Sequence, residues 1–138
     1  MFKKALSLVV SLMLMVTSLS FAAISVSAAV TTYVVAGVEE LCGVLWKGSP
    51  EEAPANVMTD NGDGTYTKVF TNVQPASGLT LKVVENGADG SQNWIGDATG
   101  NNITFNVTVA SDVTVKFDSS TKEITVTGDG VQFVTNLD

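Results

Sequence analysis

Apolar and polar residues alternate along most of the chain after residue 30, which is the period of a β-strand that buries one face. In residues 103–109, for example, isoleucine, phenylalanine and valine alternate with threonine and asparagine. No window in this part of the chain has the period of a helix. The segments predicted to form strands are residues 31–37, 57–59, 66–73, 79–85, 103–109, 113–117 and 124–128, with 131–134 as a final edge strand or a tail.

Turns and two longer irregular segments separate these strands. Residues 60–64 (DNGDG) are a dense turn signal, and residues 39–54 and 86–101 are rich in Gly, Pro, Asp or Asn. The first irregular segment also contains Leu, Cys and Trp, so we expect part of it to pack against the sheets. Seven or eight short strands in about 110 residues predict one antiparallel, all-β sandwich without a second domain.

The N-terminus has the pattern of an export signal. Lys3 and Lys4 precede an apolar run that ends in small residues, and cleavage is predicted after Ala28, with Ala29 as the next choice. Residues 1–28 are therefore interpreted as a signal peptide and 29–138 as the mature domain. The alternative is an uncleaved membrane anchor, since the apolar run is long for a signal peptide. A secreted protein is expected, with attachment to the cell surface left open and no membrane contact after cleavage.

The net charge of the predicted mature domain limits the classes of partner that we expect. Without Lys3 and Lys4, five of the seven lysines remain against fourteen acidic residues, for a net charge of −9, and the chain has no Arg and no His. Nucleic acids and anionic membranes need cationic side chains, so neither is expected as a partner. Neutral ligands such as carbohydrates remain open.

The sequence lacks the residues that most classes of catalytic site require. Triads and zinc sites need His or several Cys, and Cys42 is the sole cysteine. The acidic pairs lie in predicted loops, where carboxylates are usually solvated, and residues 60–65 depart from a calcium loop at position three, which is Gly62. We expect no catalytic residue, no metal and no cofactor.

The two tryptophans are the candidate binding residues, because each lies in an irregular segment. A tryptophan in a loop either fills a gap in the core or offers its face to a sugar ring, and the sequence leaves both alternatives open. Trp94 follows Asn93, and Trp46 precedes Lys47, so both have polar neighbours able to bond sugar hydroxyls.

Several segments together resemble one family. They are residues 34–37 (VVAG), 41–43 (LCG) with Trp46, 58–68 (MTDNGDGTYTK), 70–73 (FTNV), 81–84 (LKVV), 93–96 (NWIG), 101–105 (NNITF), 112–118 (DVTVKFD) and 122–128 (KEITVTG). On these segments the chain resembles the immunoglobulin-like β-sandwich modules associated with bacterial pullulanases and other amylolytic enzymes, which are related to starch-binding modules. The family usually reads Trp-Asp-Pro after its first tryptophan, whereas this chain reads WKGSP at 46–50.

The resemblance implies an immunoglobulin-like sandwich and a non-catalytic function. It implies binding of starch-like α-glucans through Trp94 and Asn93, helped by Trp46 and Lys47. The alternative is a structural or interaction module without a sugar site, whose partner is another secreted protein paired with an edge strand such as 131–134.

Overall fold

The computed structural model describes residues 30–133, in which two short helical segments accompany nine strands. The predicted signal peptide, residues 1–28, lies outside the described residues. In chain order the elements are β1 (Thr32–Gly37), α2 (Glu39–Cys42), η1 (Pro54–Asn56), β2 (Thr59–Asp60), β3 (Thr65–Val73), β4 (Ala76–Asn86), β5 (Gln92–Ile95), β6 (Ile103–Val107), β7 (Ser111–Asp118), β8 (Glu123–Thr127) and β9 (Val131–Phe133).

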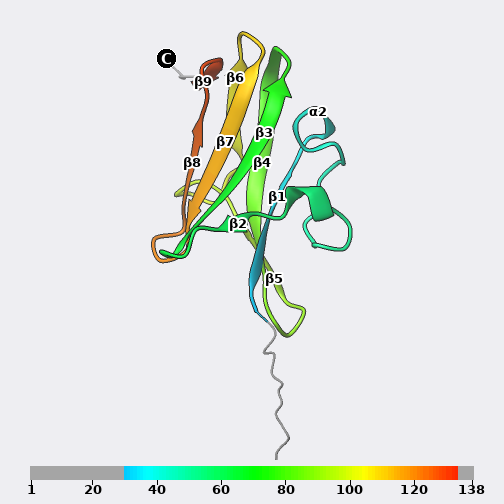
Figure 1. The fold of residues 1–138 in the computed structure, drawn as a ribbon, viewed down its shortest axis with the longest axis vertical. Helices are drawn as coiled ribbons and strands as arrows, with labels where there is room; N and C mark the ends of the chain where they lie inside the picture. Colours follow the sequence, from blue (N-terminus) through cyan, green and yellow to red (C-terminus); the bar gives the residue numbers. More distant parts are fainter. Residues whose placement is uncertain (1–29, 134–138) are drawn as a thin grey trace, which may run out of the picture. The chain divides into compact units, whose positions relative to one another are not determined.

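The strands form two antiparallel sheets. One has the order β1-β4-β6-β9, with β5 also paired to β4, and the other has the order β2-β3-β7-β8. In Figure 1, β3, β7 and β8 run side by side, with β4 and β6 in the layer behind them. The prediction of an all-β sandwich is confirmed.

The core between the two sheets follows the alternation seen in the sequence. Leu79, Leu81 and Val83 of β4 are buried in one cluster with Phe105 of β6 and Phe117 of β7. Each strand places every second side chain on the inner face, so short segments with simple alternation suffice to build this core.

The outer face of the β1–β4 pair is buried as well. Val34 and Val84 are opposite one another in the register of β1 and β4, and both are fully buried although neither belongs to the core between the sheets. The segment between α2 and β2 covers them. Three hydrogen bonds fix it to the strands. They run from the Trp46 N–H to the Gly37 carbonyl, from the Met58 N–H to the Tyr33 carbonyl and from Asn86 Nδ2 to the Gly48 carbonyl, each 2.8 Å long. The expectation that residues 39–54 pack in part against the sheets is confirmed.

The structure corrects the predicted elements in several places. The strand predicted at 79–85 is β4, which begins at Ala76 and ends at Asn86. The irregular segments contain α2, η1 and strand β5, which are only three or four residues long and show no readable period. The strand predicted at 103–109 ends at Val107, and the short strand predicted at 57–59 is β2, Thr59–Asp60. The final edge strand is present as β9, while Val134 lies outside the described residues.

Candidate functional site

Trp94 lies on the outer face of the first sheet, in strand β5. It is opposite Val84 in the register of β4 and β5, and Val84 is opposite Val34 of β1, so the three side chains form one row across the strands. Residues opposite one another in a sheet share a face, which places the indole on the outer side of the sandwich. The exposed fraction of Trp94 is 38%, so its indole is partly buried and partly accessible to solvent.

Trp46 comes to the same face from a distant part of the sequence. Its backbone has φ of +51°, an uncommon value for a bulky residue, and its side chain is half-buried. The ring centroids of Trp46 and Trp94 are 6.5 Å apart, and the ring planes are inclined by 37°. We call these two indoles the tryptophan pair.

Gly48 allows the pair to form at this distance. A Cβ added there would lie 2.8 Å from Cζ2 of Trp94 and 2.9 Å from Cγ2 of Val84, which is closer than real contacts allow. Only glycine therefore fits between the sheet and the indole without displacing one of them.

Side-chain amides connect the parts of this site. Trp94 Nε1 donates to Gln92 Oε1 (3.3 Å), Gln92 Nε2 donates to Asn86 Oδ1 (2.9 Å), and Asn86 Nδ2 donates to the Gly48 carbonyl. The chain of bonds links β4 and β5 to the segment that carries Trp46. Sequence reasoning missed Asn86, because an asparagine at the end of a strand is an ordinary turn residue.

The two predicted polar residues of the site are placed differently from one another. Lys47 adjoins Trp46 in sequence, and its ammonium lies 3.8 Å from a carboxylate oxygen of Glu52 in an exposed ion pair. Asn93 is opposite Glu85 in the register, and its Nδ2 lies 3.5 Å from Glu85 Oε1. Neighbouring residues of a strand point to opposite faces, so the structure does not bring Asn93 to the tryptophan pair.

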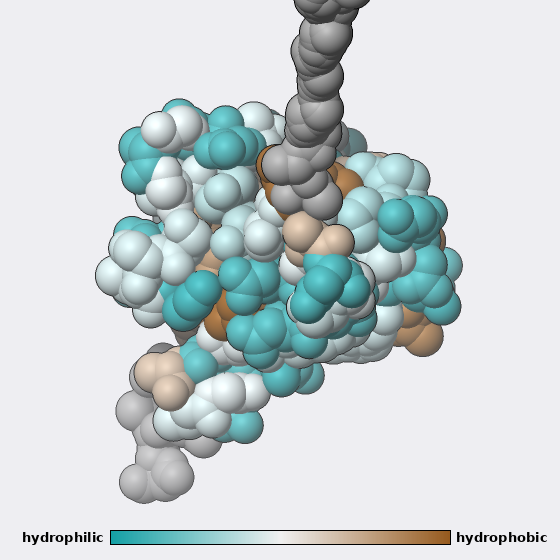
Figure 2. All heavy atoms as spheres, turned by 90° about the horizontal axis from the view of Figure 1, so that it is seen from below, coloured by the Kyte–Doolittle hydropathy of each residue, from teal (hydrophilic) through white to brown (hydrophobic). Residues whose placement is uncertain are grey.

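The surface at the end of the domain where β5 lies is mostly polar. Viewed from the end at which β5 lies, hydrophilic and neutral residues cover most of the surface, and apolar residues show only in small areas (Figure 2). The arrangement offers two aromatic faces with flanking amides, which suits a ligand with both apolar and hydroxyl-bearing sides.

Other kinds of site find little support in the described range. Across residues 30–133, no group of three or more His, Cys, Asp or Glu side chains is placed to hold a metal ion. The same residues contain no helix with the length and apolar character needed to span a bilayer.

No protein-family model matches this chain, and no curated protein matches it.

Proposed function

We propose that this protein is a secreted, non-catalytic module that binds starch-like α-glucans through Trp46 and Trp94. The observation that carries the proposal is the tryptophan pair itself, two accessible indoles whose centroids lie 6.5 Å apart on one face. The pyranose ring has an apolar face that packs on an aromatic ring, while its hydroxyls require polar partners. Gln92 and Asn86 supply amide groups beside the indoles.

The inclination of the two rings favours a curved glucan over a flat one. An α-1,4 linkage turns each glucose relative to the next, whereas a β-1,4 linkage gives an extended ribbon with coplanar faces. Two platforms inclined by 37° match successive faces of a turning chain. Coplanar platforms would be expected for the ribbon.

Affinity is expected to be weak for each single site. Two partly exposed rings remove little area from water, and the glucan loses conformational freedom when it is held. Asn93 is not included in the proposed site, because its amide faces Glu85. Lys47 stays at the margin of the site, next to Trp46 and paired with Glu52.

Electrophoresis through a native gel that contains amylopectin tests the proposal. The wild-type protein should be retarded, Trp94→Ala should lose the retardation, and Trp46→Ala should reduce it. Phe133→Ala is the matched control, since Phe133 is also an exposed aromatic residue (51%) but lies on β9. A gel with a soluble cellulose derivative should give no retardation.

Circular dichroism and thermal unfolding of each variant show whether the fold survives. Retardation of Trp94→Ala equal to that of a folded wild-type protein would contradict the proposal. Absence of retardation for the wild type would favour the alternative, a module that binds another secreted protein.

A further inference from the structure

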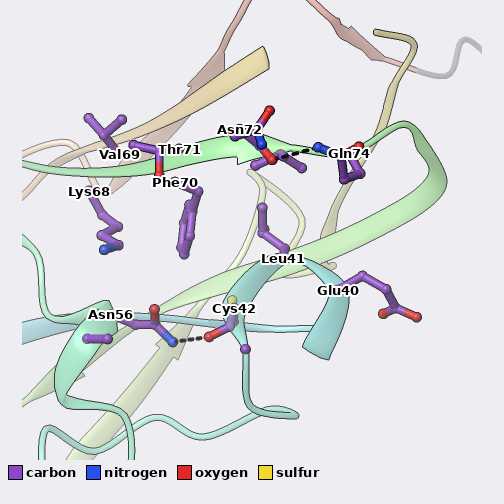
Figure 3. Close-up of a pocket in the computed structure, with 13 residues that line it drawn as sticks. Glu40, Leu41, Cys42, Asn56, Lys68, Val69, Phe70, Thr71, Asn72 and Gln74 are labelled. Atoms are coloured by element: carbon purple, nitrogen blue, oxygen red, sulfur yellow. Dashed lines mark hydrogen bonds between the residues drawn. The ribbon is translucent and has the colours of Figure 1, made fainter. Parts of the chain in front are cut away.

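A groove opens at the other side of the domain, between β3 and the helical segments α2 and η1. It has a volume of about 370 Å³ and is lined by residues 40–43, 55–56 and 68–74. This is within the usual size range of ligand sites, roughly 300–1,000 Å³. We call it the β3 groove (Figure 3).

One wall of the β3 groove is a strand edge without a partner strand. On one edge β3 pairs with β7 over most of its length. On the other edge β2 reaches only Tyr66 and Thr67, so in the described residues no strand continues on this side along Lys68–Thr71. The Asn61 N–H donates to the Thr65 carbonyl (3.0 Å), which shows that Thr65 directs its backbone groups to the β2 side. By the alternation of an antiparallel ladder, Val69 directs its N–H and carbonyl to the same side, into the groove.

The floor of the groove is apolar and carries one buried amide. Phe70, Leu41 and Cys42 are buried there. Asn56 is only 3% exposed, and its Nδ2 donates to the Cys42 carbonyl (2.9 Å). Its Oδ1 accepts no hydrogen bond from the described residues and points to the β3 side of the groove in Figure 3. No buried side-chain polar atom of the described residues lacks a partner, so this oxygen is reached by solvent from the groove and is free to accept a hydrogen bond there.

Lys68 adds a positive charge to the groove. Its side chain and that of Phe70 extend from β3 toward Asn56 and Cys42, whereas Val69 points away (Figure 3). The ammonium lies 5.1 Å from the centroid of the Phe70 ring, and Lys68 makes no ion pair within residues 30–133. In a strongly acidic protein, this is a local site for a carboxylate.

We propose that the β3 groove binds an extended peptide segment of a partner protein. The segment continues the line of β2 and runs antiparallel to β3, where its backbone bonds Val69 and its inward side chains lie on Phe70 and Leu41. A carboxylate of the segment faces the Lys68 ammonium. This mode of binding, strand addition to a free sheet edge, takes its affinity from main-chain hydrogen bonds and its specificity from alternate side chains.

The shape of the groove favours one extended segment over a second copy of the domain. α2 and η1 stand opposite the free edge, so another sheet cannot approach it without displacing them. An inward-pointing lysine also discourages pairing between whole sheet edges.

The test is a nuclear magnetic resonance titration of ¹⁵N-labelled protein, produced from the full coding sequence, with the capped hexapeptide Ac-TVTVTE-NH₂. Shifts should concentrate at Val69, Thr71 and Asn56. Two further peptides are N-methylated at one or the other set of alternate amides. One of them should bind about tenfold more weakly or not at all, because it lacks the N–H groups that face β3, while the other should bind like the parent. Equal binding of both, or no shifts with the parent peptide, would overturn the proposal.

Charge reversal tests the role of Lys68 in the same assay. Lys68→Glu should weaken binding of Ac-TVTVTE-NH₂ and strengthen binding of Ac-TVTVTK-NH₂. Lys116→Glu makes the same change of net charge on exposed Lys116 of β7 and should leave both peptides unaffected. Weakening by both variants alike would contradict a carboxylate site at Lys68.

The peptide site and the glucan site can fail separately. Trp94→Ala should keep peptide binding, and Lys68→Glu should keep retardation by amylopectin. Shifts at Val69 and Asn56 on addition of maltoheptaose, without shifts from the peptide, would make the β3 groove a sugar site and overturn the proposal.

Discussion

Gly48 controls the position of the Trp94 indole more directly than any polar neighbour does. A methyl group at this residue would meet Cζ2 of Trp94 and Cγ2 of Val84, each at less than 3 Å. Val84 is fixed in the sheet, whereas Trp94 lies on the short strand β5 and is partly exposed, so the indole is the group that moves.

Gly48→Ala should therefore weaken retardation by amylopectin while the fold persists. We expect the free energy of unfolding to fall by about 1–3 kcal/mol, the usual effect of adding atoms to a packed site. Tryptophan fluorescence should report the displaced indole. Wild-type fluorescence and wild-type retardation together would show that the indole does not rest on Gly48.

The raised pKa values of Cys42 and Tyr33 predict that the folded protein loses stability at alkaline pH. Burial raises the pKa of the Cys42 thiol from 9.0 to about 12, opposed by the nearby Lys68 ammonium. Burial, and then the hydrogen bond to Glu85, raise the pKa of Tyr33 from 10.0 to about 12. Both groups hold their protons more tightly in the folded state, so their contribution is complete below pH 9 and is lost as the pH rises from about 9 toward 12.

Urea unfolding at a series of pH values measures this loss, and Cys42→Ala should make the alkaline decline shallower. In the folded protein the thiol should also resist alkylation at pH 8 and react only after unfolding, since the thiolate is the reactive form. Rapid alkylation of the native protein would mean that the thiol is neither buried nor neutral.

At the scale of elements, the segment between α2 and β2 is held on the sheet by few bonds, and Asn86 makes one of them. Asn86→Ala would leave the Gly48 carbonyl and Gln92 Nε2 without this partner. The free energy of unfolding should fall by about 1–2 kcal/mol, and retardation by amylopectin should weaken because Trp46 is less well positioned.

Asn93→Ala is the matched control for this change. It removes the same type of side chain from β5, but on the face that carries Glu85. Retardation should stay close to that of the wild type. If Asn93→Ala weakened retardation more than Asn86→Ala did, the sugar site would lie on the other face of β5.

The strands could be predicted wherever burial alternates, and the candidate site only in part. In β7, Val113, Val115 and Phe117 are buried between more exposed residues, which is the pattern read from the sequence. Strand β5 has three exposed residues out of four and lies among Gly, Asp and Asn, so nothing local distinguishes it from a loop. Trp94 and Trp46 could be selected as aromatic residues in irregular segments, but their proximity depends on the pairing of β5 with β4, a non-local event.

At the scale of the whole molecule, the segment between β1 and β2 serves both proposed sites. Trp46 is one member of the tryptophan pair and Gly48 lies against the other, while Leu41, Cys42 and Asn56 line the β3 groove. The dependence of binding on salt concentration should distinguish the two sites. Stacking of a neutral glucan involves no ion pair, whereas the attraction between the Lys68 ammonium and a carboxylate is screened by dissolved salt.

Raising NaCl from about 0.05 M to about 0.5 M should therefore leave retardation by amylopectin nearly unchanged and weaken binding of Ac-TVTVTE-NH₂. The gel experiment and the peptide titration can use the same protein preparation. A strong loss of amylopectin retardation at high salt would indicate that charged groups, and not the indoles, hold the glucan.

The most direct test of the central claim observes the two indoles during binding. The chain has only two tryptophans, so a ¹⁵N-labelled protein gives two indole N–H signals, which Trp94→Ala and Trp46→Ala assign. On titration with maltoheptaose up to about 10 mM, a range that covers weak binding, both indole signals should shift along one saturating curve. Indole signals that stay in place throughout this titration would contradict glucan binding by the tryptophan pair.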